Sequence, residues 1–297
     1  DAVGLFLVPR KRPDGSLNEC HLLRLKDLSG TRGKATAEVE YQDAYAELIG
    51  RASHGMALLL RSVLRTSRFH VAAASLGFMR RALLEARLYA NSRLILGRPL
   101  ARLPHVARTL ERLETIHTVC LLAFFEELDF IERGDPAAEV LIPLLKIQVS
   151  RLASEAVRQT RLLMAGNAVL RDFSILPRLA EDALIQEIWE GTHPILAGHV
   201  LRALRRPSSC KAFFASLNIA TAQGKAAHDC ARALETLLAG LGSLSAEDRT
   251  PKSHQACALA WRALSLSLLS RHCGGPLDKD GSFARFAAIA AQEPDGL

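Results

Sequence analysis

A run of about forty residues without proline, from Ala52 to Arg93, limits most strongly what this chain can fold into. Its apolar side chains recur at three- and four-residue steps, the spacing of one face of an α-helix. At 1.5 Å per residue, a helix of this length extends about 60 Å. Because so long a helix usually belongs to a bundle, we expect a helical bundle to form the main part of the fold.

Four further segments have helical patterns, at about 103–131, 137–163, 211–241 and 253–272. Loops are expected at 133–136, 243–251 and 274–276, where glycine, proline and serine gather. The chain is 49% hydrophobic and only 5% aromatic, which favours helices with a substantial core. The acidic group Glu126, Glu127, Asp129 and Glu132 has no histidine at a ligand spacing, so we interpret it as a solvated face and expect no metal site.

The first fifty residues have strand character instead. Residues 2–26 indicate two strands joined by a turn at 12–16, and a second pair follows at 35–41 and 45–49. The predicted fold is therefore mainly α with a small β part at the start.

The stretch Leu184–Arg206 carries the acidic residue with the clearest chemical context. Glu190 follows Trp189 and precedes Gly191, at a break between two helical patterns. Thr192 can cap the second helix, and Pro194 fits its first turn. The free N–H groups of that helix would attract an anion such as phosphate.

A carboxylate held against an aromatic ring, out of bulk water, can act as a base near neutral pH. On spacing alone, the simpler interpretation of Glu190 is a surface carboxylate just before a capped helix.

The sequence Ile188-Trp-Glu-Gly-Thr192 resembles the I-[YW]-E-G-[TS] signature of the acyl-CoA dehydrogenases. The resemblance implies that Glu190 removes the α-proton of an acyl-CoA thioester while hydride passes to FAD, and that Gly191 and Thr192 lie against the flavin. An AidB-like branch of the family is suggested by five segments: Leu5–Arg10, Arg24–Asp27, Leu176–Leu179, Ile188–Thr192 and Val200–Arg202.

The same resemblance implies three parts. Residues 1–50 correspond to the C-terminal half of the family's middle β-domain, 51–206 to its C-terminal helical domain, and 207–297 to the extra helices of the AidB-like branch. The family's N-terminal helical domain has no counterpart here, and the first residue is Asp1. We therefore expect the chain to be the C-terminal portion of a longer protein.

Three more residues take roles by resemblance. Arg68 matches an arginine close to the base, although a solvated surface arginine is an equally good interpretation. Arg93, in a turn similar to R-x-x-F-G-x-x-L, would reach the flavin pyrophosphate of a neighbouring subunit. Gly166 is the one clean match to Q-x-x-G-G-x-G in Leu162–Ala168, where alanine replaces glycine at positions 165 and 168 and would crowd a dinucleotide.

Arg202, Arg205 and Arg206 form a basic cluster, and the formal net charge of the chain is +7. Arg202 falls where the AidB-like branch has an arginine associated with DNA contact. The cluster lacks interleaved aromatics, so weak, non-specific phosphate binding and a solvated surface both remain open.

The six cysteines lie far apart, and no apolar run approaches the length needed to span a bilayer. Reduced thiols indicate an intracellular protein, whether mitochondrial, peroxisomal or cytoplasmic. The resemblance implies an FAD-dependent acyl-CoA dehydrogenase that assembles as a homodimer or homotetramer. The alternative is a non-catalytic protein that binds flavin, acyl chains or nucleic acid on the same scaffold.

Overall fold

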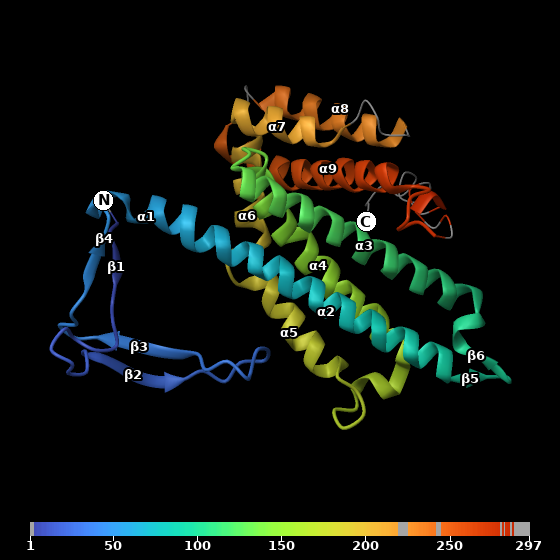
Figure 1. Cartoon of the computed structure of the whole chain (residues 1–297), viewed down its shortest axis with the longest axis horizontal. Helices are drawn as coiled ribbons and strands as arrows, with labels where there is room; N and C mark the ends of the chain where they lie inside the picture. The colour runs from blue at the N-terminus through green and yellow to red at the C-terminus, as the bar shows by residue number, and fades with distance from the viewer. Residues whose placement is uncertain are drawn as a thin grey trace. The chain divides into compact units, whose positions relative to one another are not determined.

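A computed structural model describes residues 3–218, 225–241, 245–279, 281, 283–285 and 287. It divides into two compact units, Asp1–Arg68 and Phe69–Leu297. The first holds the longer strands, and the second is almost entirely helical (Figure 1). The expected class, mainly α with a small β part, is confirmed. The three-part division drawn from the family resemblance stays a prediction.

Four strands form where the sequence predicts them, but they pair as a nested set. They are β1 (Leu5–Leu7), β2 (Cys20–Leu25), β3 (Ala37–Tyr41) and β4 (Glu47–Ile49). The outer strands β1 and β4 pair antiparallel, and so do the inner strands β2 and β3. The turn between β1 and β2 is tied by Asp14, whose Oδ1 accepts bonds from the backbone N–H and the hydroxyl of Ser16.

Asn18 joins the two pairs. Its side-chain amide donates to the carbonyls of Pro9 and Tyr45, both at 2.8 Å. Its oxygen accepts from the backbone N–H groups of Tyr45, at 2.8 Å, and Glu19, at 3.0 Å. The buried amide thus uses its whole hydrogen-bonding capacity within the first unit.

The predicted long helix is present from Gly55 onward as α1 (Gly55–Leu58), the π-turn η2 (Leu59–Val63) and α2 (Leu64–Ser92), after the short 3₁₀ turn η1 (Ala52–His54). A Cβ on Gly55 would lie 2.4 Å from the backbone of Gly4, so the helix can start against β1 only with glycine here. A two-residue hairpin, β5 (Leu94–Ile95) and β6 (Arg98–Pro99), and the turn η3 (Leu100–Arg102) follow α2.

The second unit is built around α4. Its remaining elements up to residue 204 are α3 (Pro104–Arg133), α4 (Ala138–Met164), η4 (Ala165–Val169), α5 (Leu176–Ile188) and α6 (His193–Leu204). Helices α3, α5 and α6 all pack on α4. As a result every residue from 140 to 150 is buried, Lys146 included. The main hydrophobic core extends from α2 through α4 to α9.

The C-terminal helices differ from the predicted pattern at two places. They are α7 (Pro207–Ser216), α8 (Lys225–Gly240) and α9 (Ala246–His272), with α8 alongside α9 (Figure 1). The helical run expected over 211–241 is interrupted after Ser216, where Asn218 takes a φ of +46°. Within the expected loop 243–251, helix α9 already begins at Ala246.

The early start of α9 has a local cause. The Ser245 hydroxyl accepts the backbone N–H of Asp248 at 3.1 Å and donates to its carboxylate at 2.6 Å. This cap, with two acidic residues in the first turn, outweighs the cost of Pro251 inside the helix. No described helix is both long and apolar enough to cross a membrane. None of the six cysteines, all within the described ranges, forms a disulfide.

Candidate active site

Glu190 lies in the tight turn between α5 and α6, as the break in the sequence pattern predicts. The φ angles of Glu190 and Gly191 are +58° and +107°. The chain bends at these two residues of positive φ, so that α6 continues along α4 where α5 ends, and both helices pack on α4. Glycine adopts such angles at little cost, whereas a glutamate is strained by roughly 1–2 kcal/mol. Glu190 is half-buried and is held in the kind of strained backbone that often marks a functional site.

The turn is anchored to α4 by Lys146. Its ammonium is fully buried and donates to the carbonyl of Glu187 at 3.0 Å and to that of Gly191 at 2.8 Å. Glu187 belongs to the last turn of α5, where carbonyls lack helical partners and the helix dipole is negative. Lys146 is not among the residues predicted from the sequence, although a single lysine in the apolar run 140–147 is a signal for a buried, specifically bonded cation.

His193, the first residue of α6, joins the same group of residues. Its Nε2 lies 3.3 Å from Ser150 Oγ and 3.8 Å from a carboxylate oxygen of Glu187. The Ser150 hydroxyl donates to the Lys146 carbonyl at 2.6 Å, so it can only accept from His193. This geometry assigns the Nε2–H tautomer to the ring.

Burial lowers the pKa of His193 below its usual value, against the opposing effect of Glu187, and the nearby cations Lys146 and Arg151 lower it further. The ring is therefore neutral at pH 7. In the assigned tautomer the one proton of the neutral ring is on Nε2, which faces Ser150 and Glu187.

Trp189 precedes Glu190 and is the C-cap residue of α5. Its indole N–H donates to the side-chain oxygen of Gln186 at 3.0 Å, and Gln186 is buried. The bond limits rotation of the indole and fixes the ring next to the turn. The aromatic neighbour that the sequence places beside Glu190 is thus held in one orientation.

Thr192 occupies the N-cap position of α6, and Pro194 lies in its first turn, as predicted. The predicted capping bond is absent, because the Thr192 side chain accepts no hydrogen bond from the first turn. The Thr192 backbone carbonyl instead accepts the N–H of Leu196 at 3.1 Å. The exposed Thr192 hydroxyl is not used to cap the helix.

Arg93 and Gly166 lie together at the other end of the helical unit. Tyr89 of α2 accepts the backbone N–H of Arg93 at 2.8 Å, and its hydroxyl accepts the Asn167 amide at 3.0 Å. Both the Arg93 side chain and Gly166 are exposed. Gly166 is twenty residues beyond Lys146, just past the end of α4, which corresponds to roughly 30 Å of helix. The two groups of predicted site residues are therefore well apart in one molecule.

The turn at η4 has a glycine-like backbone at an alanine. Ala165 has φ +51° and ψ −133°, a conformation that L-residues with a Cβ rarely adopt. A Cβ on Gly166 would meet no atom within 4 Å, whereas Ala168 is buried. The backbone of Ala165 thus has a conformation that glycine favours, and the residue lies in an exposed turn.

Arg68 ends the first unit and is only 7% exposed. Its burial argues against the alternative of a solvated surface arginine. Because Glu190 belongs to the second unit, the expected proximity of the two residues stays a prediction.

The basic cluster at the end of α6 is exposed. Arg202, Arg205 and Arg206 all face solvent, and Arg206 forms an ion pair with Glu139 of α4. Only part of the cluster's charge is therefore available to an anionic partner. Phosphate binding by these residues stays a prediction.

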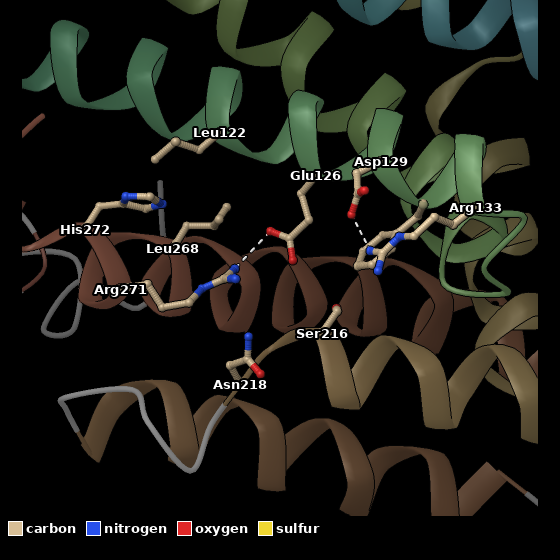
Figure 2. Close-up of a pocket in the computed structure, with 10 residues that line it drawn as sticks. Leu122, Glu126, Asp129, Arg133, Ser216, Asn218, Leu268, Arg271 and His272 are labelled. Carbon is tan, nitrogen blue, oxygen red and sulfur yellow. Dashed lines mark hydrogen bonds and ion pairs between the residues drawn. The ribbon is translucent and has the colours of Figure 1, made fainter.

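Only half of the acidic group on α3 is the solvated face that the sequence suggests, because Asp129 and Glu132 are exposed but Glu126 and Glu127 are not. Glu127 is fully buried, and Glu126 forms an ion pair of 2.9 Å with Arg271 of α9. Figure 2 shows this pair inside a cavity of about 350 Å³ between α3, the end of α7 and α9. Acidic residues can turn inward here because α9 supplies a cation, which periodicity within α3 does not reveal. None of the predicted site residues lines this cavity, and the described residues contain no cluster suited to a metal ion.

Comparisons with known proteins agree with this architecture. Residues 53–205 match the family model of the acyl-CoA dehydrogenase C-terminal domain. Acyl-CoA dehydrogenase family member 11 of Caenorhabditis elegans is 32% identical over 209 residues, which is 67% of this chain and 34% of that protein. AidB of Escherichia coli (strain K12) is 33% identical over 206 residues, 68% of this chain and 38% of the relative.

Solved structures of similar proteins match a larger share of the chain. The crystal structure of C. elegans ACDH-11 in complex with C11-CoA matches with a TM-score of 0.81 at 28% identity and covers 98% of this chain and 53% of its own. The Bd2924 apo-form gives 0.79 at 27% identity, over 89% and 53% of the two chains. The chain thus spans about a third of the curated relatives and about half of the solved chains. A family model that matches more than half of the chain, with the Glu190 turn at its end, shows that the chain belongs to the acyl-CoA dehydrogenase family.

Proposed function

We propose that this chain provides the base-bearing helical part of an FAD-dependent acyl-CoA dehydrogenase. Glu190 takes the α-proton of an acyl-CoA thioester, and hydride from the β-carbon passes to the flavin, which leaves an enoyl-CoA. The observation that carries the proposal is the strained Glu190–Gly191 turn, anchored by Lys146 and lying beside a fixed indole. A positioned base typically contributes about 10²–10⁴ in rate.

The substrate class rests on a relative. ACDH-11 was solved in complex with C11-CoA, and its structure superimposes on nearly the whole of this chain. An acyl-CoA thioester is therefore the first substrate to test. FAD is the cofactor that the family chemistry requires; it accepts the hydride when bound, and Gly191 and Thr192 are the residues of this turn that would lie against it. The exposed Thr192 hydroxyl, which does not cap α6, fits that role.

A homodimer or homotetramer would complete the site. Arg93 and Gly166 lie roughly 30 Å along α4 from the Glu190 anchor, which fits their assignment to the flavin of a neighbouring subunit. Large apolar side chains are exposed around these two turns, and such a surface is typical of an interface. They are Leu94, Ile95, Leu96, Leu162, Val169, Leu170 and Phe173.

The decisive experiment measures flavin bleaching by acyl-CoA in the protein that the complete gene encodes, loaded with FAD. Glu190→Gln keeps the size of the side chain and removes the base, so bleaching should slow by at least about 10²-fold. Glu181→Gln on α5, which removes a carboxylate paired with Arg171 nine residues before Glu190, is the matched control and should bleach normally. Equal rates in Glu190→Gln and the control would refute the assignment of the base.

One observation favours the alternative, a non-catalytic binding protein. The Ala165 methyl occupies a turn whose backbone suits glycine, and this turn is the proposed contact for the adenosine half of the flavin. A protein that is purified colourless and stays so with excess FAD would support the alternative. Weak nucleic-acid binding through Arg202 and Arg205 would then be tested by its salt dependence, since phosphate contacts weaken as salt rises.

A further inference from the structure

Lys146 is the most unusual side chain of the helical unit. It lies on α4 within eleven consecutive buried residues, and its ammonium is fully buried. An apolar residue is the default at such a position, because burying a charge is costly unless the charge is well bonded. A lysine here therefore needs a specific reason.

The bonds of Lys146 suggest the reason. Its two carbonyl partners belong to Glu187 and Gly191, which flank Glu190 on both sides. One partner is the end of α5 and the other is the turn itself, so a single cation ties together the two backbone segments that hold the base. Positive φ angles at consecutive residues persist only where surrounding contacts over-determine them.

A second contact from the same face of α4 holds the far side of the turn. Ser150 lies one helical turn after Lys146, and its hydroxyl contacts His193 at the start of α6. The two side chains of α4 thus contact the chain before Glu190, at Glu187, and after it, at Gly191 and His193.

We propose that Lys146 is a positioning residue for Glu190, which fixes the turn that carries the carboxylate through the carbonyls of Glu187 and Gly191. The inference rests on the proposed function of Glu190 as the base. Lys146 does not touch the substrate in this proposal; it acts through the backbone. A base displaced by about 1 Å can lose about 10²-fold in rate.

The test uses Lys146→Met, which keeps the length of the side chain and removes its donors. Thr160→Val is the matched control, because it also removes a buried polar group from α4, but its hydroxyl bonds to Ala156 and Ala82, away from the turn. Both variants are made in the FAD-loaded protein that the complete gene encodes. Circular dichroism verifies that the helices are retained.

The first readout needs no flavin chemistry. The protein is labelled with 5-fluorotryptophan, and the ¹⁹F signal of Trp189 is identified as the one missing from Trp189→Phe. Lys146→Met should move or broaden that signal, and Thr160→Val should leave it unchanged. An unchanged Trp189 signal in Lys146→Met would overturn the anchoring role, whatever the activity of the protein.

The second readout is kinetic. Lys146→Met should lower kcat for flavin bleaching by about 10²-fold, with a smaller change in KM, because binding of the acyl-CoA is less sensitive to the base than proton removal is. A shifted Trp189 signal with an unchanged kcat would overturn the positioning role. If the wild-type protein bleaches no flavin, the proposed function fails, while the Trp189 signal still decides the anchoring role. Should Lys146→Met not fold, Lys146→Gln, whose amide can reach one carbonyl, replaces it with the same readouts.

Discussion

The backbone of Glu190 offers a stability test that is independent of catalysis. Glu190→Ala and Glu190→Gly both remove the whole carboxylate, so the lost side-chain contacts cancel when the two variants are compared. They differ by one methyl group at a φ of +58°. A Cβ in the left-handed region costs roughly 1–2 kcal/mol. Glycine in turn lowers the stability by about 0.5–1 kcal/mol relative to alanine, because it makes the unfolded chain more flexible.

The net expectation is that Glu190→Gly is more stable than Glu190→Ala by about 0.5–1 kcal/mol. In a unit of this size the difference raises Tm by about 2 °C. Urea unfolding followed by circular dichroism at 222 nm measures the free energy of unfolding, and a temperature scan measures Tm.

Gly198 provides the internal control. It lies inside α6, and a Cβ there would meet no atom within 4 Å, so Gly198→Ala should stabilise the protein by about 0.5–1 kcal/mol. The same exchange of glycine for alanine thus has opposite signs at positions 198 and 190. If Glu190→Ala proves as stable as Glu190→Gly while Gly198→Ala behaves as expected, the reasoning about strain in the turn is refuted.

Three other predictions follow from the structure. Because the pKa of His193 is lowered in the folded protein, the unfolded state takes up a proton first as pH falls. The contribution of His193 to stability is therefore full above pH 6.5, the usual histidine value, and is lost as pH falls through the folded pKa. Urea unfolding of the wild type and of His193→Gln at several pH values would measure this loss. Ala165→Gly should raise the free energy of unfolding by about 1 kcal/mol and tighten FAD binding, and weaker binding by calorimetry would contradict the crowding account. Asn18→Ala should lower the stability of the first unit by about 2 kcal/mol, seen as faster hydrogen exchange in β2 and β3, with Ser16→Ala as an exposed control.

The sequence predicts the helices of the second unit well, because their faces are set by local periodicity. The same periodicity misjudges Glu126 on α3, since its partner comes from α9, 145 residues away. Strand positions are also predictable, but their nested pairing depends on Asn18 and on contacts between distant residues. Helix α9 begins early because a serine cap and two acids outweigh a proline, a balance of local effects that a search for prolines alone misses.

For the candidate site, the sequence identifies the turn and its base through one short motif. It places Glu190, Gly191 and Thr192 correctly between two helices, but it assigns the Thr192 side chain a capping bond that does not form. It gives no indication that Lys146 supports the turn, because that contact spans 41 to 45 residues and joins a side chain to backbone carbonyls. Backbone acceptors exist at every position, so residue types alone cannot reveal which of them is used.

The burial of residues 140–150 has a consequence for how this protein can change over time. An amphipathic helix has a solvent-exposed residue every three or four positions, and substitutions are tolerated there. Its tolerance to substitution therefore varies periodically along the sequence. The middle of α4 has no solvent-exposed face, because each of these eleven positions is buried by neighbouring residues. Substitutions there must conserve both volume and polarity. A map of tolerated mutations would therefore show one continuous intolerant block in α4, where amphipathic helices show a periodic pattern.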